Sequence, residues 1–365
     1  GQCEYVSKDS GIAISSCFVG SSSCEATCRC EKGFVGSASC SVSTSDFNVK
    51  SILREHLINS IQSLVLIEYP TTEAVNGWMS SLSDATQVPT ELTDSSVGTV
   101  FNMSVRIIQT AARLQLSTSA LSRVLSSVDL ATQQLHFSAN NDSKMQKLAS
   151  VNSTLNVLQL YTSTIADALV PGQHAVESIY SQFRLSVSTL SSDRYSLPLS
   201  SLEKSTGIVA SSVALQTPTN DLNYPIVNLI QLRSGLYNNS NFLSNSIGIN
   251  FLDYPCRNSA SKEKCNVDIT LQNSDPVNYN IVEYVNTSCV LGKYRVYYHK
   301  CVSNHLLRIV CDGNSTRTIQ SKCPFGHSAA TCLRLSSSAT TLNAALVNCS
   351  LKTYNPFNTT CQCTF

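Results

Sequence analysis

The sequence predicts a multidomain α+β protein: a small disulfide-rich module, a helical bundle, and then an antiparallel β-sandwich with a cysteine-rich end. Three observations predict this fold. The 365 residues exceed one typical domain, the 16 cysteines gather toward the two ends of the chain, and the spacing of apolar residues changes near Tyr180 from a helical period to alternation. We therefore expect segments at residues 1–42, 43–175, 176–288 and 289–365.

Composition limits the classes of function. The chain has 25 Lys+Arg against 24 Asp+Glu, and charged residues make up 13% of it, about half the usual quarter. A net charge this close to zero argues against a nucleic-acid partner, which would need a dense basic footprint. The longest uncharged apolar runs are shorter than the ~20 residues of a membrane helix, so we expect no membrane span within this chain.

Cysteines divide the chain into three parts, and none occurs between Ser41 and Pro255. The first cluster is Cys3, Cys17, Cys24, Cys28, Cys30 and Cys40. The second cluster is Cys256, Cys265, Cys289, Cys301, Cys311, Cys323, Cys332, Cys349, Cys361 and Cys363. Even counts in such segments are typical of disulfide frameworks made in an oxidising compartment. We therefore expect all sixteen to be crosslinked in an extracellular protein, secreted or at a cell surface.

Asn-x-Ser/Thr sequons are frequent along the chain and suggest a glycoprotein with N-linked glycans. They stand at Asn102, Asn141, Asn152, Asn238, Asn286, Asn314, Asn348 and Asn358. Because composition alone would give about 7 sequons by chance, the prediction of compartment depends on the cysteines, and the sequons only support it.

The first forty residues end in a Cys-x-Cys-x9-Cys pattern from Cys28 to Cys40, in which Gly33 suits a tight turn. This stretch resembles the closing half of an EGF-like module. The resemblance implies the pairs Cys3–Cys24, Cys17–Cys28 and Cys30–Cys40. About 40 residues cannot fold without such staples. An unrelated small disulfide knot is the alternative, because connectivity cannot be deduced from spacing.

Apolar residues recur at three- and four-residue spacing in the cysteine-free middle. We expect Ser45-Asp46 to cap a helix that runs to about Glu68 and buries one face. That face consists of Val49, Ile52, Leu53, Leu57, Ile61, Leu64 and Val65. Further helices are expected from Pro89 onward, at 118–131 and at 143–170. Because Ser and Thr are poor helix formers, these helices must stabilise one another, which predicts a bundle.

Beyond about Tyr180, apolar and polar residues alternate as in half-buried strands. The expected strands are Phe183–Leu190, Gly207–Leu215, Ile226–Leu232, Ile247–Leu252, Val267–Leu271 and Ile281–Val285. Gly, Pro, Asn and Asp separate them, and an antiparallel β-sandwich is the expected result.

The chain closes in Cys361-Gln362-Cys363-Thr364-Phe365. A Cys-x-Cys end behind helical and β-rich segments resembles the GAIN-type ectodomains of polycystins and adhesion receptors, and the layout is also similar to protist surface glycoproteins of the mastigoneme type. Self-cleavage in the GAIN family needs a His-Leu step that is missing before Thr364, so we expect no autoproteolysis. Cys361 and Cys363 are too close to pair easily with each other. We expect each to bond a different upstream cysteine and pin the final strand.

The sequence shows no set of residues typical of an enzyme active site. The chain has no Gly-x-Ser-x-Gly motif, no Walker loop and no dinucleotide fingerprint. His299, Cys301 and His305 could be drawn as a zinc site, but in an oxidising segment Cys301 is expected in a disulfide. The sequence therefore predicts no catalytic residue, no metal site and no cofactor.

These observations favour a non-enzymatic structural or adhesive glycoprotein, such as a subunit of a surface filament or a mastigoneme-like flagellar appendage. Its expected partners are other protein chains, as a homo-oligomer or filament. From Cys256 onward there are 11 Lys+Arg and 5 Asp+Glu, net +6, against net −5 before it, which could support head-to-tail association or be accidental. The alternative is a ligand-binding or force-bearing ectodomain of a membrane receptor or polycystin-like protein. A hydrolase is a distant third.

Overall fold

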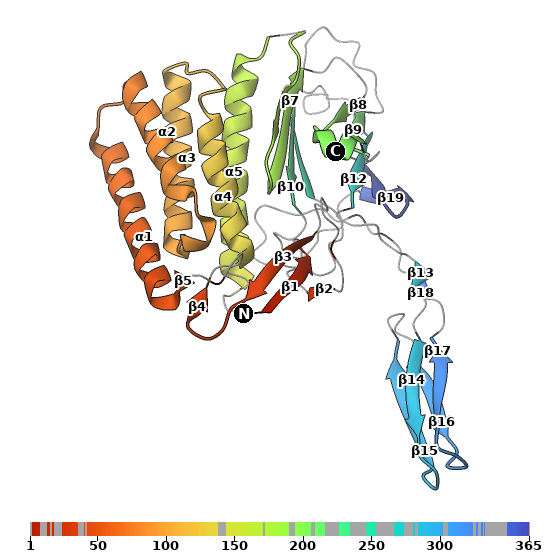
Figure 1. Cartoon of the computed structure of the whole chain (residues 1–365). Coiled ribbons are helices and arrows are strands. Elements are labelled where there is room, and N and C mark those ends of the chain that lie inside the picture. The colour runs from red at the N-terminus through yellow and green to blue at the C-terminus, as the bar shows by residue number, and fades with distance from the viewer. Residues whose placement is uncertain are drawn as a thin grey trace.

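The structure is a computed structural model of mixed α+β type, with helices, antiparallel sheets and several disulfides, which confirms the coarse fold class. Figure 1 shows the arrangement of these elements. The residues that the structure describes are 2–7, 13–14, 17, 24–35, 40, 42–137, 144–170, 172–189, 194–205, 209–215, 226–233, 246–252, 266–273, 280–281, 284–301, 306–323, 326–327, 330, 332 and 349–364.

The N-terminal region forms two small antiparallel pieces. Strands β1 (Gln2–Ser7), β2 (Ala13–Ile14) and β3 (Cys24–Arg29) make a sheet in the order β2-β1-β3. Strands β4 (Phe34–Val35) and β5 (Val42–Ser43) make a short ribbon. The turn before β4 places Gly33 at φ +97°, a backbone conformation that favours glycine. This agrees with the turn expected there.

Five long helices follow, and hydroxyl side chains cap the first three. They are α1 (Thr44–Ile67), α2 (Thr72–Thr86), α3 (Asp94–Arg113), α4 (Ser122–Phe137) and α5 (Lys144–Ala168), with a 3-10 turn η1 (Pro89–Glu91) before α3. The side chains of Ser43, Thr71 and Thr93 each accept a hydrogen bond from a backbone N–H in the first turn. Each such cap contributes about 1 kcal/mol. The cap of α1 is therefore Ser43, not the expected Ser45-Asp46.

The helices pack on one another in a layer, and α5 lies beside strands β7 (Phe183–Thr189) and β10 (Ile226–Leu232) of a sheet (Figure 1). Their shared apolar cluster includes Trp78 and Phe101 from the helices and Phe183 and Ile230 from the sheet. Helix α1 lies at the far edge of this layer, away from the sheet (Figure 1). Arg54 ties α1 to its neighbours, because its guanidinium donates to the Glu91 carboxylate and to the Ala85 carbonyl.

Two antiparallel sheets share a second apolar cluster. The first sheet has the order β11-β10-β7-β6, and the second has the order β19-β20-β12-β9-β8. Their strands are β6 (Val176–Ile179), β7 (Phe183–Thr189), β8 (Arg194–Ser196), β9 (Ser212–Leu215), β10 (Ile226–Leu232), β11 (Ser246–Leu252), β12 (Asn266–Gln272), β19 (Cys349–Tyr354) and β20 (Asn358–Thr364). A short helix α6 (Ser201–Ser205) lies between β8 and β9. Val227 and Leu229 of β10 pack with Val213 and Val267 of the second sheet, while Ile230 packs on the helices. Strand β10 is thus buried on both faces.

Between β13 (Asn280–Ile281) and β18 (Gly326–His327), which pair as a short ribbon, the chain forms a separate unit of four strands. Its strands are β14 (Tyr284–Cys289), β15 (Arg295–Lys300), β16 (Leu306–Cys311) and β17 (Arg317–Lys322). Strand β14 pairs with β17, and β15 pairs with β16. We call residues 284–323 the stapled double ribbon. In Figure 1 it stands apart from the helices and the two large sheets.

One expected segment boundary does not coincide with a break in the fold. The boundary at 288/289 falls inside β14, whose ladder with β17 keeps both sides in one unit. The second sheet also joins the expected segments, because β12 pairs along its whole length with β20. Segment 289–365 is therefore not a separate unit in the structure.

Candidate interaction surfaces

Most of the predicted site residues that the structure describes are cysteines in disulfide bonds. Cys289 bonds Cys311, and Cys301 bonds Cys323. The second bond removes the zinc alternative, because the Cys301 sulfur is already used. Among the described residues, no group of His, Cys, Asp and Glu could hold a metal ion.

The last strand is pinned as the sequence predicts. Cys361 bonds Cys332, and Cys363 bonds Cys349, so each cysteine of the terminal Cys-x-Cys pair reaches a different upstream partner. Cys349 and Cys363 are also directly opposite in the β19–β20 ladder. Two covalent bonds therefore hold β20 beside its neighbours.

The N-terminal cysteines fit the implied pairing only in part. Cys30 bonds Cys40, and Cys17 is also disulfide-bonded. The β1–β3 register places Cys3 opposite Cys28 and places Cys24 four residues further along, opposite Ser7. Four residues of strand span about 13 Å, which is more than a disulfide bridges. This register does not fit a Cys3–Cys24 bond, while Cys256 and Cys265 lie outside the described residues.

The sequons differ in exposure. Asn102, Asn286 and Asn314 are exposed, whereas Asn152 and Asn358 are half-buried. Asn141, Asn238 and Asn348 lie outside the described residues. Asn286 is on β14 and Asn314 is in the turn between β16 and β17, so the stapled double ribbon carries two of the three sequons that are exposed among the described residues.

The buried carboxylate of Asp129 on α4 connects the helices to the sheet through hydrogen bonds. One carboxylate oxygen accepts from the Gln182 backbone N–H at 2.7 Å, and the other accepts from the Ser181 hydroxyl at 2.8 Å. Burial raises the pKa of Asp129, and the hydrogen bonds and the charge of Arg233 only partly oppose this shift. Both oxygens are occupied by the turn between β6 and β7, so Asp129 anchors the helices to the sheet.

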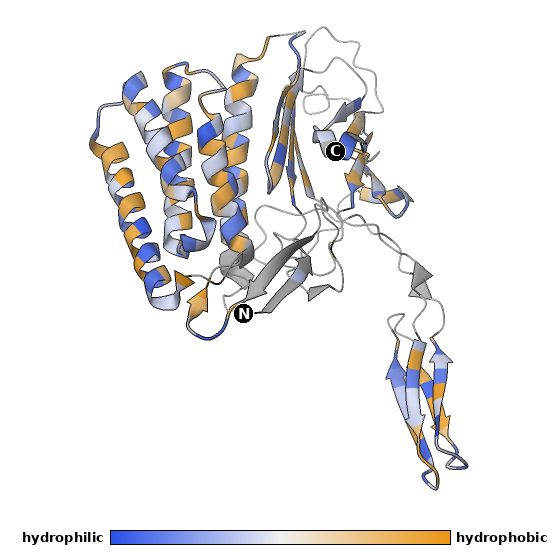
Figure 2. Cartoon of the chain, in the orientation of Figure 1, coloured by the Kyte–Doolittle hydropathy of each residue, from blue (hydrophilic) through white to orange (hydrophobic). Residues whose placement is uncertain are grey.

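Helix α1 exposes apolar side chains on the side turned away from the core. Ile58, Ile61 and Val65 are buried, but the rest of the face that the sequence predicted to be buried is exposed. Its exposed members are Val49, Ile52, Leu53, Leu57 and Leu64, and Leu66 and Ile67 are exposed as well. The expectation of a buried face was therefore wrong for these five positions. Figure 2 shows how much apolar sequence this edge helix carries. We call the exposed set the α1 stripe.

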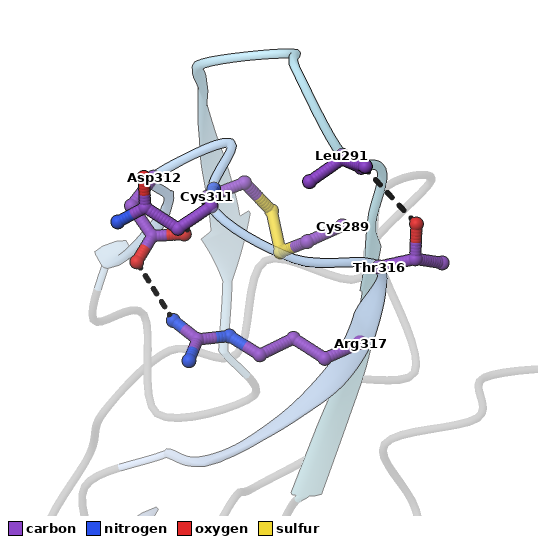
Figure 3. The surroundings of a disulfide bond; sticks show 7 residues. Cys289, Leu291, Cys311, Asp312, Thr316 and Arg317 are labelled. Atoms are coloured by element: carbon purple, nitrogen blue, oxygen red, sulfur yellow. Dashed lines mark hydrogen bonds and ion pairs between the residues drawn. A yellow bond between two sulfur atoms is a disulfide. The ribbon is translucent and has the colours of Figure 1, made fainter.

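The stapled double ribbon is crosslinked at both ends. At the tip, Cys289–Cys311 lies beside one contact between the two turns and one ion pair within the turn between β16 and β17 (Figure 3). The Leu291 N–H donates to the Thr316 hydroxyl at 3.1 Å, and Arg317 pairs with Asp312 at 3.1 Å. The Cys301–Cys323 bond closes the other end. A unit of about 40 residues buries too little apolar surface to fold unaided, so these bonds hold its shape.

Each ribbon of this unit has an inner and an outer face. Cys289 and Cys311 point toward each other, so the residues that alternate with them point outward. On the outer faces, Tyr298 lies directly opposite Arg308, and Tyr284 lies directly opposite Lys322. The tyrosine rings are exposed by 63% and 56%. These residues were not among those predicted from the sequence, although Tyr298 and Lys300 are two residues apart and therefore share one face of a strand.

No family model matches this chain, and no curated protein matches it either. The resemblance to EGF-like and GAIN-type proteins therefore stays a prediction from motifs. The fold and surfaces define the chain only as a mixed α+β protein with disulfide-stapled β units. In the part of the chain that the structure describes, no helix is long and apolar enough to cross a bilayer.

Proposed function

We propose that this chain is a non-enzymatic, extracellular structural or adhesive glycoprotein that assembles with other copies of itself, as in a cell-surface filament or a mastigoneme-like appendage. The observation that carries the proposal is the α1 stripe. Seven exposed apolar side chains on one helix mark a contact surface, and His56, Asn59, Ser60 and Ser63 are exposed among them. The EGF-like, bundle and sandwich order suggested by the motifs belongs to the same proposal, and the crosslinked β units support the extracellular location.

A second copy is the partner that the α1 stripe fits best. Between Glu55 and Glu68 the helix carries no charged residue, so this part of two stripes can meet without burying an unpaired charge. Lys50 is exposed beside the N-terminal part of the stripe. Val49 to Ile67 span about 27 Å of helix axis. A pair of helices in contact over this length would bury less surface than the ~1,200–2,000 Å² that stable complexes bury. We therefore expect reversible association. Two stripes meeting symmetrically give a closed dimer, and a filament requires a further surface.

The test is the concentration dependence of molar mass. Sedimentation velocity of the full chain should show association that persists at high salt, because apolar contacts are not screened as charges are. The double variant Leu53→Glu with Leu57→Glu should be monomeric at the same concentrations. Val170→Glu, which changes an equally exposed aliphatic residue at the end of α5, should associate like the wild type.

Three outcomes would oppose the proposal. A wild-type chain that stays monomeric at high concentration would remove the basis for assembly. Equal association of the double variant and wild type would move the contact away from α1. Association that disappears at high salt would favour instead a head-to-tail contact between the oppositely charged parts of the chain.

A second candidate is a ligand-binding or force-bearing ectodomain of a receptor or polycystin-like protein, without autoproteolysis. The observation that favours it is the pinned strand β20, since two disulfides can hold a strand in its sheet under load. Reduction that leaves β20 as protected from hydrogen exchange as before would count against this candidate.

A further inference from the structure

The outer face of the β15–β16 ribbon gathers aromatic, aliphatic and basic side chains. It consists of Val296, Tyr298, Lys300, Leu306, Arg308 and Val310, which alternate with the inward residues Ile309 and Cys311. Ile309 and Cys311 are buried, and the Cys311 bond to Cys289 directs that side toward β14. The remaining side faces solvent, and Tyr298, Lys300, Leu306 and Arg308 are exposed on it.

This face carries two cations, Lys300 and Arg308, within a unit that is basic as a whole. Between Tyr284 and Cys323 the chain has six Lys+Arg and a single acidic residue, Asp312. Asp312 is already paired with Arg317. Strands β15 and β16 themselves contain no Asp or Glu. The cations of this face therefore have no acidic neighbour on their own strands, and the local field attracts anions.

The spacing of the groups suits a chain of sugars that carries acidic substituents. Tyr298 and Arg308 are cross-strand partners, with Cβ atoms about 5 Å apart. Lys300 follows Tyr298 on the same face after about 7 Å of strand. The exposed ring of Tyr298 offers a flat surface for the C–H face of a sugar ring. Lys300 and Arg308 on either side of it lie within reach of the sulfate or carboxylate groups of that sugar.

We propose that the outer face of β15–β16 binds an acidic polysaccharide, with a sugar ring stacked on Tyr298 and anionic groups paired with Lys300 and Arg308. The inference rests on the proposed adhesive function and specifies its ligand class. An acidic protein would not need the exposed ring. A nucleic acid would need a basic surface larger than one ribbon face offers.

The β14–β17 ribbon provides an internal comparison. Its outer face also carries a tyrosine opposite a cation, Tyr284 and Lys322. On the same face, Asn286 stands two residues from Tyr284 and belongs to an exposed sequon. A glycan attached at Asn286 would cover this pair, whereas no sequon lies on β15 or β16. The β15–β16 face is thus the one left open for a ligand.

The experiment measures binding of the glycosylated full chain to immobilised heparin, alginate and neutral dextran at low and physiological salt. Wild type should bind heparin and alginate, more weakly at higher salt, and should not bind dextran. Lys300→Gln with Arg308→Gln should weaken binding about fivefold to tenfold. Tyr298→Ala should weaken it about threefold to tenfold with an unchanged salt dependence, and Tyr298→Phe should bind like wild type.

The matched controls are Tyr284→Ala and Lys322→Gln, which should bind within about twofold of wild type. Absence of wild-type binding at low salt, equal losses in the control variants, or equal affinity for dextran would overturn the proposal. Equal affinity for polyglutamate or DNA would also overturn it, by showing an unspecific basic patch. The assembly experiment measures molar mass, whereas this experiment measures polysaccharide binding. The proposal of self-association and the proposal of polysaccharide binding can therefore fail independently.

Discussion

Single side chains join the layers of this protein, and Asp129 is the clearest case. It comes from α4, yet both of its carboxylate oxygens accept hydrogen bonds from residues 181 and 182 of the β6–β7 turn. Tyr180 adds a bond from the same turn to the Ser122 carbonyl at 3.2 Å. Because only 8% of Asp129 is exposed, its ionised form is costly in the folded chain, and its hydrogen bonds offset only part of that cost.

The raised pKa of Asp129 predicts a pH dependence of stability. The folded chain holds a proton at this carboxyl more tightly than the unfolded chain, whose pKa is near 3.8. The contribution of Asp129 to the free energy of unfolding should therefore fall as the pH rises from about 3.8 through the raised value, and then level off. The Asp129→Asn variant has no carboxyl at this position, so its free energy of unfolding should lack this decrease with pH. Urea unfolding followed by Trp78 fluorescence at several pH values measures the difference.

Trp78 is a suitable reporter because it is the only tryptophan and is buried among the helices. The free energy of wild type minus that of the variant should decrease with rising pH across this window. A difference that stays constant from acid to neutral pH would show that Asp129 has the same proton affinity in both states.

At the scale of elements, the stapled double ribbon depends on its crosslinks. It has two short ladders, little apolar interior and disulfides at both ends. The helices α1–α5, in contrast, contain no cysteine and share a large apolar cluster. The two kinds of element should therefore respond differently to a reductant.

Removing the Cys301–Cys323 bond with serine at both positions should destabilise the double ribbon by about 2–5 kcal/mol. Hydrogen exchange measured by mass spectrometry should show lost protection in residues 284–323 and unchanged protection in α1–α5. The control replaces Cys332 and Cys361 with serine, which removes a bond of the second sheet and should leave the double ribbon protected. Loss of protection in the helices after the first change would contradict this independence.

Local signals in the sequence predicted helices α1, α3, α4 and α5 and strands β7, β9, β10, β11 and β12, but not the long-range contacts of these elements. Strand β10 has the expected limits, and α5 differs from its expected limits by one or two residues. Helix α2 was missed, although Val75, Trp78, Met79 and Leu82 have helical spacing. The buried side of α1 could not be chosen because the helix is apolar on both sides. Likewise, the β14–β17 ladder pairs Tyr284 with Lys322, a distant pairing that local alternation does not encode.

At the scale of the whole molecule, exposure should decide which sequons carry glycans. Chain secreted from a glycosylating host should be modified at Asn102, Asn286 and Asn314, which are exposed. Asn152 should remain unmodified, because it is half-buried on α5 and the hydroxyl residue of its sequon, Thr154, is fully buried. Glycopeptide mass spectrometry after enzymatic release in heavy-oxygen water measures occupancy at each site. Full occupancy of Asn152 together with empty exposed sites would refute this ordering.

The disulfides in the described part of the chain join cysteines that are close in sequence. The five described disulfides join cysteines that are at most 29 residues apart, while no cysteine occurs between Ser41 and Pro255. If the molecule is pulled from its ends, these bonds stop the stapled units from lengthening. The uncrosslinked stretch of roughly 200 residues can unravel to about 700 Å. Stiff ends and an extensible middle would let the protein absorb a sudden tug without breaking a covalent bond.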